Sequence, residues 1–194
     1  MKVELLNRPT LEFIDSAIGE CYDKGKYSDI KKASKRINNV ANVYKHSSVL
    51  EFTNVIFQIT ASTKVLLEMT RHRHANYACK SSRYTLDKGE VIFEPTGDNE
   101  IDLIMEDLKI KILDQISKGK KNDVVSLMLP QCYQYRWQVQ FNYRSLQNFF
   151  KLRLDRNAHF QIREVAEAMY NSLPSEHKFL FEDCVYNSKD EING

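Results

Sequence analysis

The chain has 194 residues, of which 42% are hydrophobic and 11% aromatic. This length suits one buried core and is short for two. Its 28 basic residues oppose 26 acidic ones, so it lacks the overall positive field of a nonspecific nucleic-acid binder. No apolar run approaches the ~20 residues of a membrane-spanning helix, and the N-terminus does not resemble a signal peptide. We therefore expect one soluble, cytoplasmic domain over residues 1–194, without nucleic-acid or membrane partners.

The four cysteines are far apart in the sequence and have no paired spacing; they are Cys21, Cys79, Cys132 and Cys184. This distribution predicts neither a metal site nor a disulfide framework. It is typical of a protein in a reducing compartment.

The first half of the chain predicts short strands that alternate with helices. In chain order we expect a strand at 3–6, a helix at 10–22 capped by Thr10, a helix at 28–41, a strand at 54–60 and a helix from Ser62 to about Arg71.

The second half carries the strongest local pattern. Residues 96–118 predict an exposed helix. In residues 133–143, aromatic and aliphatic side chains such as Trp137 and Phe141 alternate strictly with polar ones, which predicts a long, half-buried strand. A helix then begins near Arg144, and another covers 158–173 before Pro174. The predicted class is α+β with an antiparallel sheet.

A dense basic cluster lies in residues 71–83. Arg71-His72-Arg73-His74 is followed by Lys80-Ser81-Ser82-Arg83. Arginine forks match phosphate oxygens, and charge-assisted bonds of this kind contribute about 1.5–3 kcal/mol each when shielded from water. The cluster is consistent with a bound nucleotide, but taken alone it is more typical of a solvated helix end whose cations face the last carbonyls.

The predicted helix after the long strand carries a second constellation. Arg144 and Asn148 are one turn apart and present donors on one face. Arg153 falls on the apolar stripe with Phe149 and Phe150, where a cation requires a partner. The spacing leaves open whether this partner is a ligand or a carboxylate such as Asp123 or Glu164.

Residues 45–51 form a polar loop in which Ser47 or Ser48 could cap a helix, with Glu51 completing a capping box. Two nucleophiles are conceivable: Cys79 beside Lys80, and Ser81 near His72 or His74. Neither has an ordered base and orienting group in the sequence, so we do not favour nucleophilic catalysis.

Taken together, these blocks resemble the flavin-dependent thymidylate synthases. Arg71-His72-Arg73, seven residues and then Ser81 match that family's signature spacing. Residues 46–51 upstream, with 142–149, Leu152-Arg153 and 181–184 downstream, match it in the same order. The resemblance covers about residues 3–185, and 186–194 then form a flexible tail.

The resemblance implies a homotetramer with sites between subunits. It further implies FAD as cofactor, dUMP as substrate of a conversion to dTMP, methylene-tetrahydrofolate as carbon donor and NADPH as reductant. The implied cofactor-binding residues are His46, Ser48, Arg71, His72, Arg73, Cys79, Asn142, Arg144 and Asn148, with His46 on the folate and nicotinamide side of the flavin.

The residues implied for dUMP are Glu68, Arg71, Lys80, Ser81, Ser82, Arg83 and Arg153. Among them, Ser81 and Arg83 would lie nearest the phosphate. Arg153 matches the arginine that bonds the uracil ring and favours its ionised form, so that carbon 5 can attack without an enzyme nucleophile. It is thus the implied catalytic residue.

The sequence also departs from the family pattern. Asn76, Ala78, Cys79 and Lys80 differ from the common residues of the motif. Ser126 stands where many members have an arginine on the dUMP phosphate, so either Lys80 or Lys121 takes its place or nucleotide affinity is weaker. Asp123 keeps the acidic position of the same segment.

Two other functions are consistent with parts of the pattern. A related enzyme with the same flavin and dUMP could deliver a hydroxymethyl group. A non-catalytic RNA- or partner-binding module could use the basic cluster, although the half-buried aromatics of 133–143 do not form a stacking surface.

Overall fold

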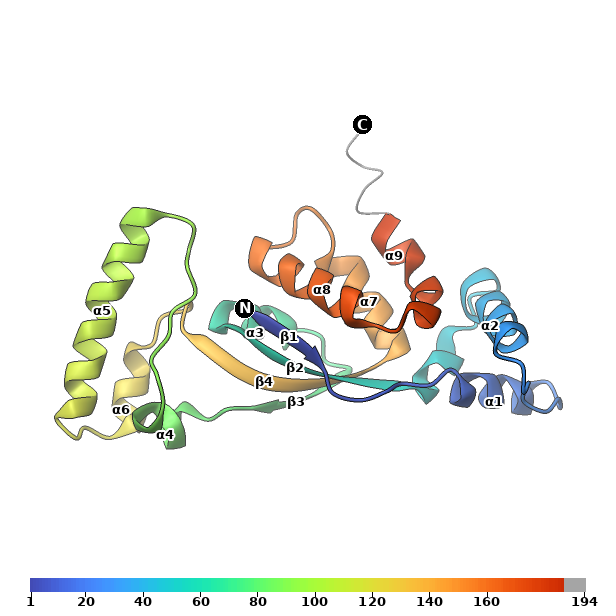
Figure 1. The fold of residues 1–194 in the computed structure, drawn as a ribbon, viewed down its shortest axis with the longest axis horizontal. Helices are drawn as coiled ribbons and strands as arrows, with labels where there is room; N and C mark the ends of the chain where they lie inside the picture. Colours follow the sequence, from blue (N-terminus) through green and yellow to red (C-terminus); the bar gives the residue numbers. More distant parts are fainter. Residues whose placement is uncertain (187–194) are drawn as a thin grey trace.

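A computed structural model describes residues 1–186, and a four-stranded antiparallel sheet lies at its centre (Figure 1). In spatial order the strands are β1 (Lys2–Leu5), β2 (Asn54–Ser62), β4 (Gln134–Asn142) and β3 (Ala75–Cys79). The pairing of β2 with β4 runs without interruption from Asn54 opposite Asn142 to Ser62 opposite Gln134. The predicted α+β class is confirmed, and so are the three predicted strands, each within two residues at either end.

The edge strand β3 was not predicted. Most of its side chains are exposed because only β4 pairs with it, so the sequence shows no alternation of buried and exposed residues. Tyr77 anchors the strand from its middle: its hydroxyl donates to the Met69 and His72 carbonyls at 2.7 and 3.1 Å. The basic residues 71–74 therefore form a tight turn rather than a free helix end.

Three helices cover one face of the sheet: α3 (Thr63–Met69), α7 (Tyr143–Arg153) and α8 (Phe160–Ser172). The inward side chains of β4 pack against α7, with Phe141 and Phe149 ring centroids 5.3 Å apart. On the other face β4 presents the exposed residues Arg136 and Gln138. Burial on one face only explains the strict alternation in this strand.

At one end of the sheet lie α1 (Glu12–Cys21) and α2 (Ile30–Asn38), which is extended by a π turn at Asn39–Val43. The cap predicted for the first helix was misplaced by one position. Leu11 is the N-cap and provides no side-chain bond, while the Thr10 hydroxyl accepts from the Glu12 N–H at 3.2 Å.

The predicted capping box at Ser48 was wrong. Ser47–Phe52 form a 3-10 helix without a side-chain cap, and Glu51 turns outward to pair with Arg144 at 2.7 Å. A 3-10 turn has different side-chain spacing from an α-helix, so the two capping partners do not meet.

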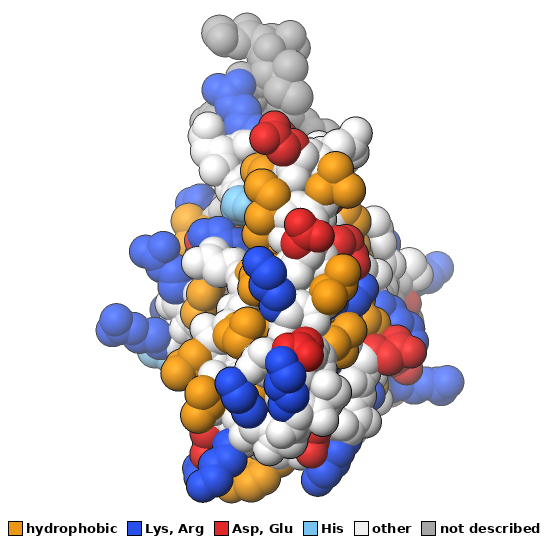
Figure 2. All heavy atoms as spheres, turned by 90° about the vertical axis from the view of Figure 1, so that its left-hand side faces the viewer, with side chains coloured by type: hydrophobic (Ala, Val, Ile, Leu, Met, Phe, Trp, Pro, Cys, Tyr) orange, Lys and Arg blue, Asp and Glu red, His pale blue; other side chains and the backbone are white. Residues whose placement is uncertain are grey.

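At the opposite end, the long α5 (Asn99–Ser117) packs with the short α4 (Ser82–Thr85) and α6 (Asn122–Val125). The 3-10 turns Leu86–Lys88 and Ser126–Met128 complete this end. A small second core joins them, made of Leu86, Val91, Ile112, Val125 and Tyr133. Figure 2 views this end and shows hydrophobic side chains interspersed with charged ones on its outer surface.

The chain ends with a 3-10 segment at Ser175–Leu180 and α9 (Glu182–Tyr186). Apart from Tyr186, the tail predicted at 186–194 lies outside the described residues. Within residues 1–186, no helix has the length and apolarity needed to cross a bilayer.

Candidate functional site

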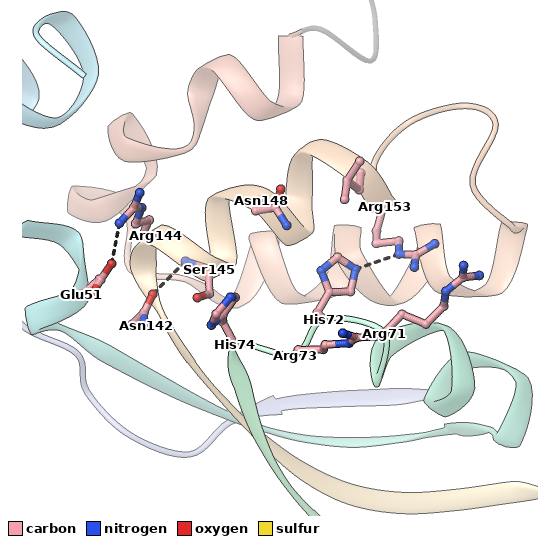
Figure 3. Close-up of a pocket in the computed structure, with 11 residues that line it drawn as sticks. Glu51, Arg71, His72, Arg73, His74, Asn142, Arg144, Ser145, Asn148 and Arg153 are labelled. Atoms are coloured by element: carbon pink, nitrogen blue, oxygen red, sulfur yellow. Dashed lines mark hydrogen bonds and ion pairs between the residues drawn. The ribbon is translucent and has the colours of Figure 1, made fainter. Parts of the chain in front are cut away.

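A cavity of about 960 Å³ lies between α7 and the turn that joins α3 to β3 (Figure 3). Its lining comes from these two elements, from the end of β4 and from the 3-10 helix Ser47–Phe52. The lining residues are Glu51, Arg71, His72, Arg73, His74, Asn142, Arg144, Ser145, Asn148, Leu152 and Arg153.

The wall formed by α7 starts at the end of β4. Asn142 is the N-cap of this helix, and its side-chain oxygen accepts from the Ser145 N–H at 2.8 Å. One turn apart on the same helix, Arg144 and Asn148 both line the cavity. The expectation that these two side chains lie on one face is therefore confirmed.

The opposite wall is the turn of residues 71–74. The His72 N–H donates to the Met69 carbonyl at 3.0 Å, and Tyr77 holds the same turn from β3. Arg71 and Arg73 line the cavity and form no hydrogen bond or ion pair within residues 1–186. Their guanidinium donors are therefore available to a ligand.

Arg153, at the last position of α7, is held on two sides. Its Nε donates to His72 Nε2, its Nη1 to a carboxylate oxygen of Glu68 and its Nη2 to the Glu68 carbonyl, each at 3.0 Å. The carboxylate partner is thus Glu68, and the alternatives Asp123 and Glu164 were wrong. These bonds use three of the five guanidinium N–H groups and leave two donors on a side chain that is only 16% exposed.

The protonation states follow from this contact network. Burial, with the nearby charges of Arg153 and Arg71, lowers the pKa of His72 to about 4. His72 is therefore neutral at pH 7, and because Nε2 accepts from Arg153, Nδ1 carries the hydrogen. The Lys64 ammonium, which hydrogen-bonds Glu68, and the Arg153 guanidinium lower the pKa of Glu68, which keeps that carboxylate ionised.

The cavity is strongly cationic. Four arginines line it against a single acidic residue, Glu51, which is already paired with Arg144. A partly enclosed space with several arginine forks and two amide side chains fits a nucleotide that carries phosphate groups. A cavity of this size is at the upper end of the range usual for cofactor sites.

Eight of the sequence-predicted site residues do not line this cavity: His46, Ser48, Glu68, Cys79, Lys80, Ser81, Ser82 and Arg83. Residues 79–83 lie at the end of β3 or directly after it. The five residues of this strand place them about 16 Å of extended chain away from Arg73. Arg83 lies on α4 and pairs with Asp123 at 2.9 Å. Ser126, at the position of the missing arginine, donates from its hydroxyl to the Asp123 carbonyl at 3.1 Å, so it contacts the residue that pairs with Arg83.

Sequence reasoning missed three lining residues as ligand candidates: Glu51, Ser145 and Leu152. His74 belonged to the predicted basic cluster, but the sequence assigned it no ligand. Helical spacing could have found two of them, because Ser145 and Leu152 lie three positions before and four after Asn148 on the same face. Glu51 could not be found in this way, since its contact with Arg144 joins residues 93 positions apart.

Fold and site together define an α+β protein with an arginine-lined cavity whose charge suits an anionic ligand. The family model described as "Thymidylate synthase complementing protein" matches residues 8–177. The flavin-dependent thymidylate synthase of Campylobacter jejuni is 32% identical, over 96% of this chain and 98% of that protein. That of Helicobacter pylori is 31% identical, over 95% and 99%.

Solved structures agree with the sequence comparisons. The crystal structure of thymidylate synthase X from Helicobacter pylori, with FAD and dUMP, matches with a TM-score of 0.84 at 30% identity and covers 95% of this chain and 99% of that one. The chain therefore belongs to the flavin-dependent thymidylate synthase family.

Proposed function

We propose that this protein converts dUMP to dTMP, with FAD bound in the arginine-lined cavity, methylene-tetrahydrofolate as carbon donor and NADPH as reductant. The observation that carries the proposal is Arg153, a guanidinium held in place by Glu68 and His72 with two N–H donors left at the cavity. Family membership over nearly the whole chain supports it.

The residues of the cavity would hold FAD in two ways. Arg71, Arg73 and Arg144 provide charge for its phosphates, and the amides of Asn142 and Asn148 can bond its polar edges. When bound, FAD supplies the hydride that the methyl transfer requires. His72 presents an N–H at Nδ1 and remains uncharged at neutral pH, so it adds a donor to the wall without adding repulsion between cations.

Arg153 has the role of stabilising negative charge on the pyrimidine ring. A guanidinium fixed before the substrate arrives needs no reorganisation when charge develops on the uracil, and such a donor contributes ~2.7–4 kcal/mol to a transition state. With the ring electron-rich, carbon 5 attacks the one-carbon donor, and no cysteine or serine nucleophile is needed.

A second subunit would complete the dUMP site. Ser81 and Arg83, the residues proposed for the dUMP phosphate, lie on or before α4 and not at the cavity that Arg153 lines. One nucleotide could contact both only if Arg153 came from one chain and Arg83 from its neighbour. This geometry supports a homotetramer with sites between subunits, and so do the exposed apolar residues of α5.

The test is purification of the protein, a flavin absorbance spectrum, and a mass assay of the nucleotide formed from dUMP, methylene-tetrahydrofolate and NADPH. We expect bound flavin and a product with the mass of dTMP. A product with the mass of a hydroxymethyl nucleotide would show that the enzyme transfers a hydroxymethyl group instead of a methyl group. Absence of both flavin and product would reject the proposed function.

A further inference from the structure

A second cavity, of about 360 Å³, lies beside α2 and is separate from the arginine-lined one. Its size falls within the range of small-molecule sites. It is lined by basic, aromatic and amide side chains without any carboxylate: Tyr27, Lys32, Lys35, Arg36, Asn39, Val40 and Tyr44.

The helix α2 places these cations on one side. Positions 32, 35, 36 and 39 follow the spacing of a single helical face, while Ala33 and Ile37 are buried on the opposite face. Asp29 caps the helix by accepting from the Lys31 and Lys32 N–H groups. The basic face is therefore held rigidly by the packing and capping of its own helix.

Arg36 has a structural role in this cavity. Its Nε donates to the buried carboxylate of Asp15 at 2.7 Å, its Nη2 to the Asp15 carbonyl at 2.9 Å, and its guanidinium carbon lies 4.3 Å from the centroid of the Tyr27 ring. Its charge is balanced by Asp15. Within residues 1–186, the side-chain ammonium groups of Lys32 and Lys35 form no hydrogen bond or ion pair. Two unpaired ammonium groups therefore line the cavity beside an arginine whose charge is already balanced.

The second cavity adjoins the loop that carries His46. Val40 and Tyr44 line it, and the His46 N–H donates to the Val40 carbonyl at 2.9 Å. A ligand that lies beside His46 could therefore extend a tail over Tyr44, whose side chain is 64% exposed, and reach the two lysines.

We propose that this cavity binds the glutamyl tail of the folate co-substrate, a flexible chain that carries one carboxylate per residue and one more at its end. The proposal rests on the proposed function, and on the position beside folate and flavin that the family resemblance implies for His46. Two ammonium groups on one helical face match successive carboxylates of such a tail, and the absence of acidic lining residues leaves no internal competitor.

The experiment compares mono- and triglutamyl methylene-tetrahydrofolate in the dTMP assay, using the wild-type protein and the Lys32→Gln/Lys35→Gln double variant. The matched control is Lys31→Gln/Lys111→Gln, which removes the same charge from exposed positions that do not line the cavity. We expect the wild-type KM to be about ten-fold lower for the triglutamyl form, because exposed ion pairs contribute modestly. This advantage should vanish in the double variant and persist in the control, with kcat unchanged throughout.

A direct binding measurement separates this proposal from the proposed function. Calorimetry with free tri-γ-glutamate should show binding that is lost in the Lys32→Gln/Lys35→Gln variant, kept in the control and weakened by added salt. If no dTMP forms but this pattern holds, the proposed function fails and the carboxylate site stands. Equal KM values for both folates in wild-type protein, or tri-γ-glutamate binding no tighter than inorganic phosphate, would overturn the proposal.

Discussion

Arg153 donates its Nε hydrogen to Nε2 of His72 at 3.0 Å, and this bond joins the end of α7 to the turn before β3 across 81 residues of sequence. It selects the neutral imidazole with its hydrogen on Nδ1, and it fixes the plane of the guanidinium. Through Glu68, the same arginine is also tied to α3. Three elements therefore determine where its two remaining donors lie.

Replacing Arg153 by Ala should lower kcat by roughly 10²–10³-fold, because a preorganised donor to the developing charge is lost. Bound flavin and the fold should be retained, since Glu68 keeps its ion pair with Lys64 at 3.2 Å. The measurements are dTMP formation and flavin absorbance on the same preparation. Near-normal turnover in this variant would reject the role assigned to Arg153.

His72 should make the folded chain less stable in acid. Its pKa is about 4 when folded against an ordinary 6.5, so as pH falls through this window the unfolded chain gains a proton that the folded chain does not. The free energy of unfolding therefore decreases from pH 6.5 towards 4, with no contribution from His72 to the slope above that range.

The measurement for His72 is the urea midpoint at several pH values for wild-type protein and a His72→Gln variant. The pKa of His177 is also lowered by burial and gives a slope of the same sign, so only the difference between the two proteins reports on His72. An identical slope in the variant would show that His72 is not held neutral.

The sheet could be predicted largely from the sequence, because burial on one face imprints alternation on a strand. Trp137, Val139 and Phe141 face the helices, while Arg136 and Gln138 do not. The strand β3 has no such alternation in its sequence, since it lies at the edge of the sheet and most of its side chains are exposed. Its existence depends on pairing with β4, a tertiary contact.

Part of the site could also be predicted, because helical spacing shows which side chains share a face. Helical spacing placed Arg144 beside Asn148, and the apolar stripe around Arg153 required a partner. The identity of that partner, Glu68, depends on a contact 85 residues away in sequence. The strand β3 likewise separates Ser81 and Arg83 from Arg71. Residues that form one basic cluster in the sequence therefore lie in two different places in the fold.

Arg144 should contribute to flavin binding through one charge-assisted hydrogen bond. Arg144→Ala is expected to weaken FAD binding about 10–100-fold, the range of a charge-assisted hydrogen bond. The dissociation constant can be measured from flavin fluorescence after removal of the cofactor. Glu51→Gln is the control, because it removes the ion pair at 2.7 Å but keeps the arginine. Equal weakening in both variants would mean that the Glu51 pair matters and the contact with FAD does not.

The apolar side of α5 should take part in subunit assembly. Leu103 and Ile110 are 71% and 65% exposed and lie seven positions apart on one helical face. Leu103→Glu/Ile110→Glu should shift the sedimentation profile to smaller species and lower activity, because sites shared between subunits would be lost. Lys111→Glu, at an exposed polar position of the same helix, should leave the profile unchanged. An unchanged profile in the double variant would exclude this face from the interface.

Arg83 should affect dUMP binding without affecting the flavin. It is exposed, and within residues 1–186 its one ion pair is with Asp123 at 2.9 Å. Arg83→Ala should therefore leave the fold intact and raise KM for dUMP about 10–100-fold, the loss of one charge-assisted bond to phosphate. Because the contact is made equally in the ground and transition states, kcat should change little. Asp123→Asn is the matched variant: it frees Arg83 from its carboxylate and should keep KM at or below the wild-type value. A fall in kcat with unchanged KM in Arg83→Ala would place this residue at the reacting atoms and contradict its assignment to the phosphate.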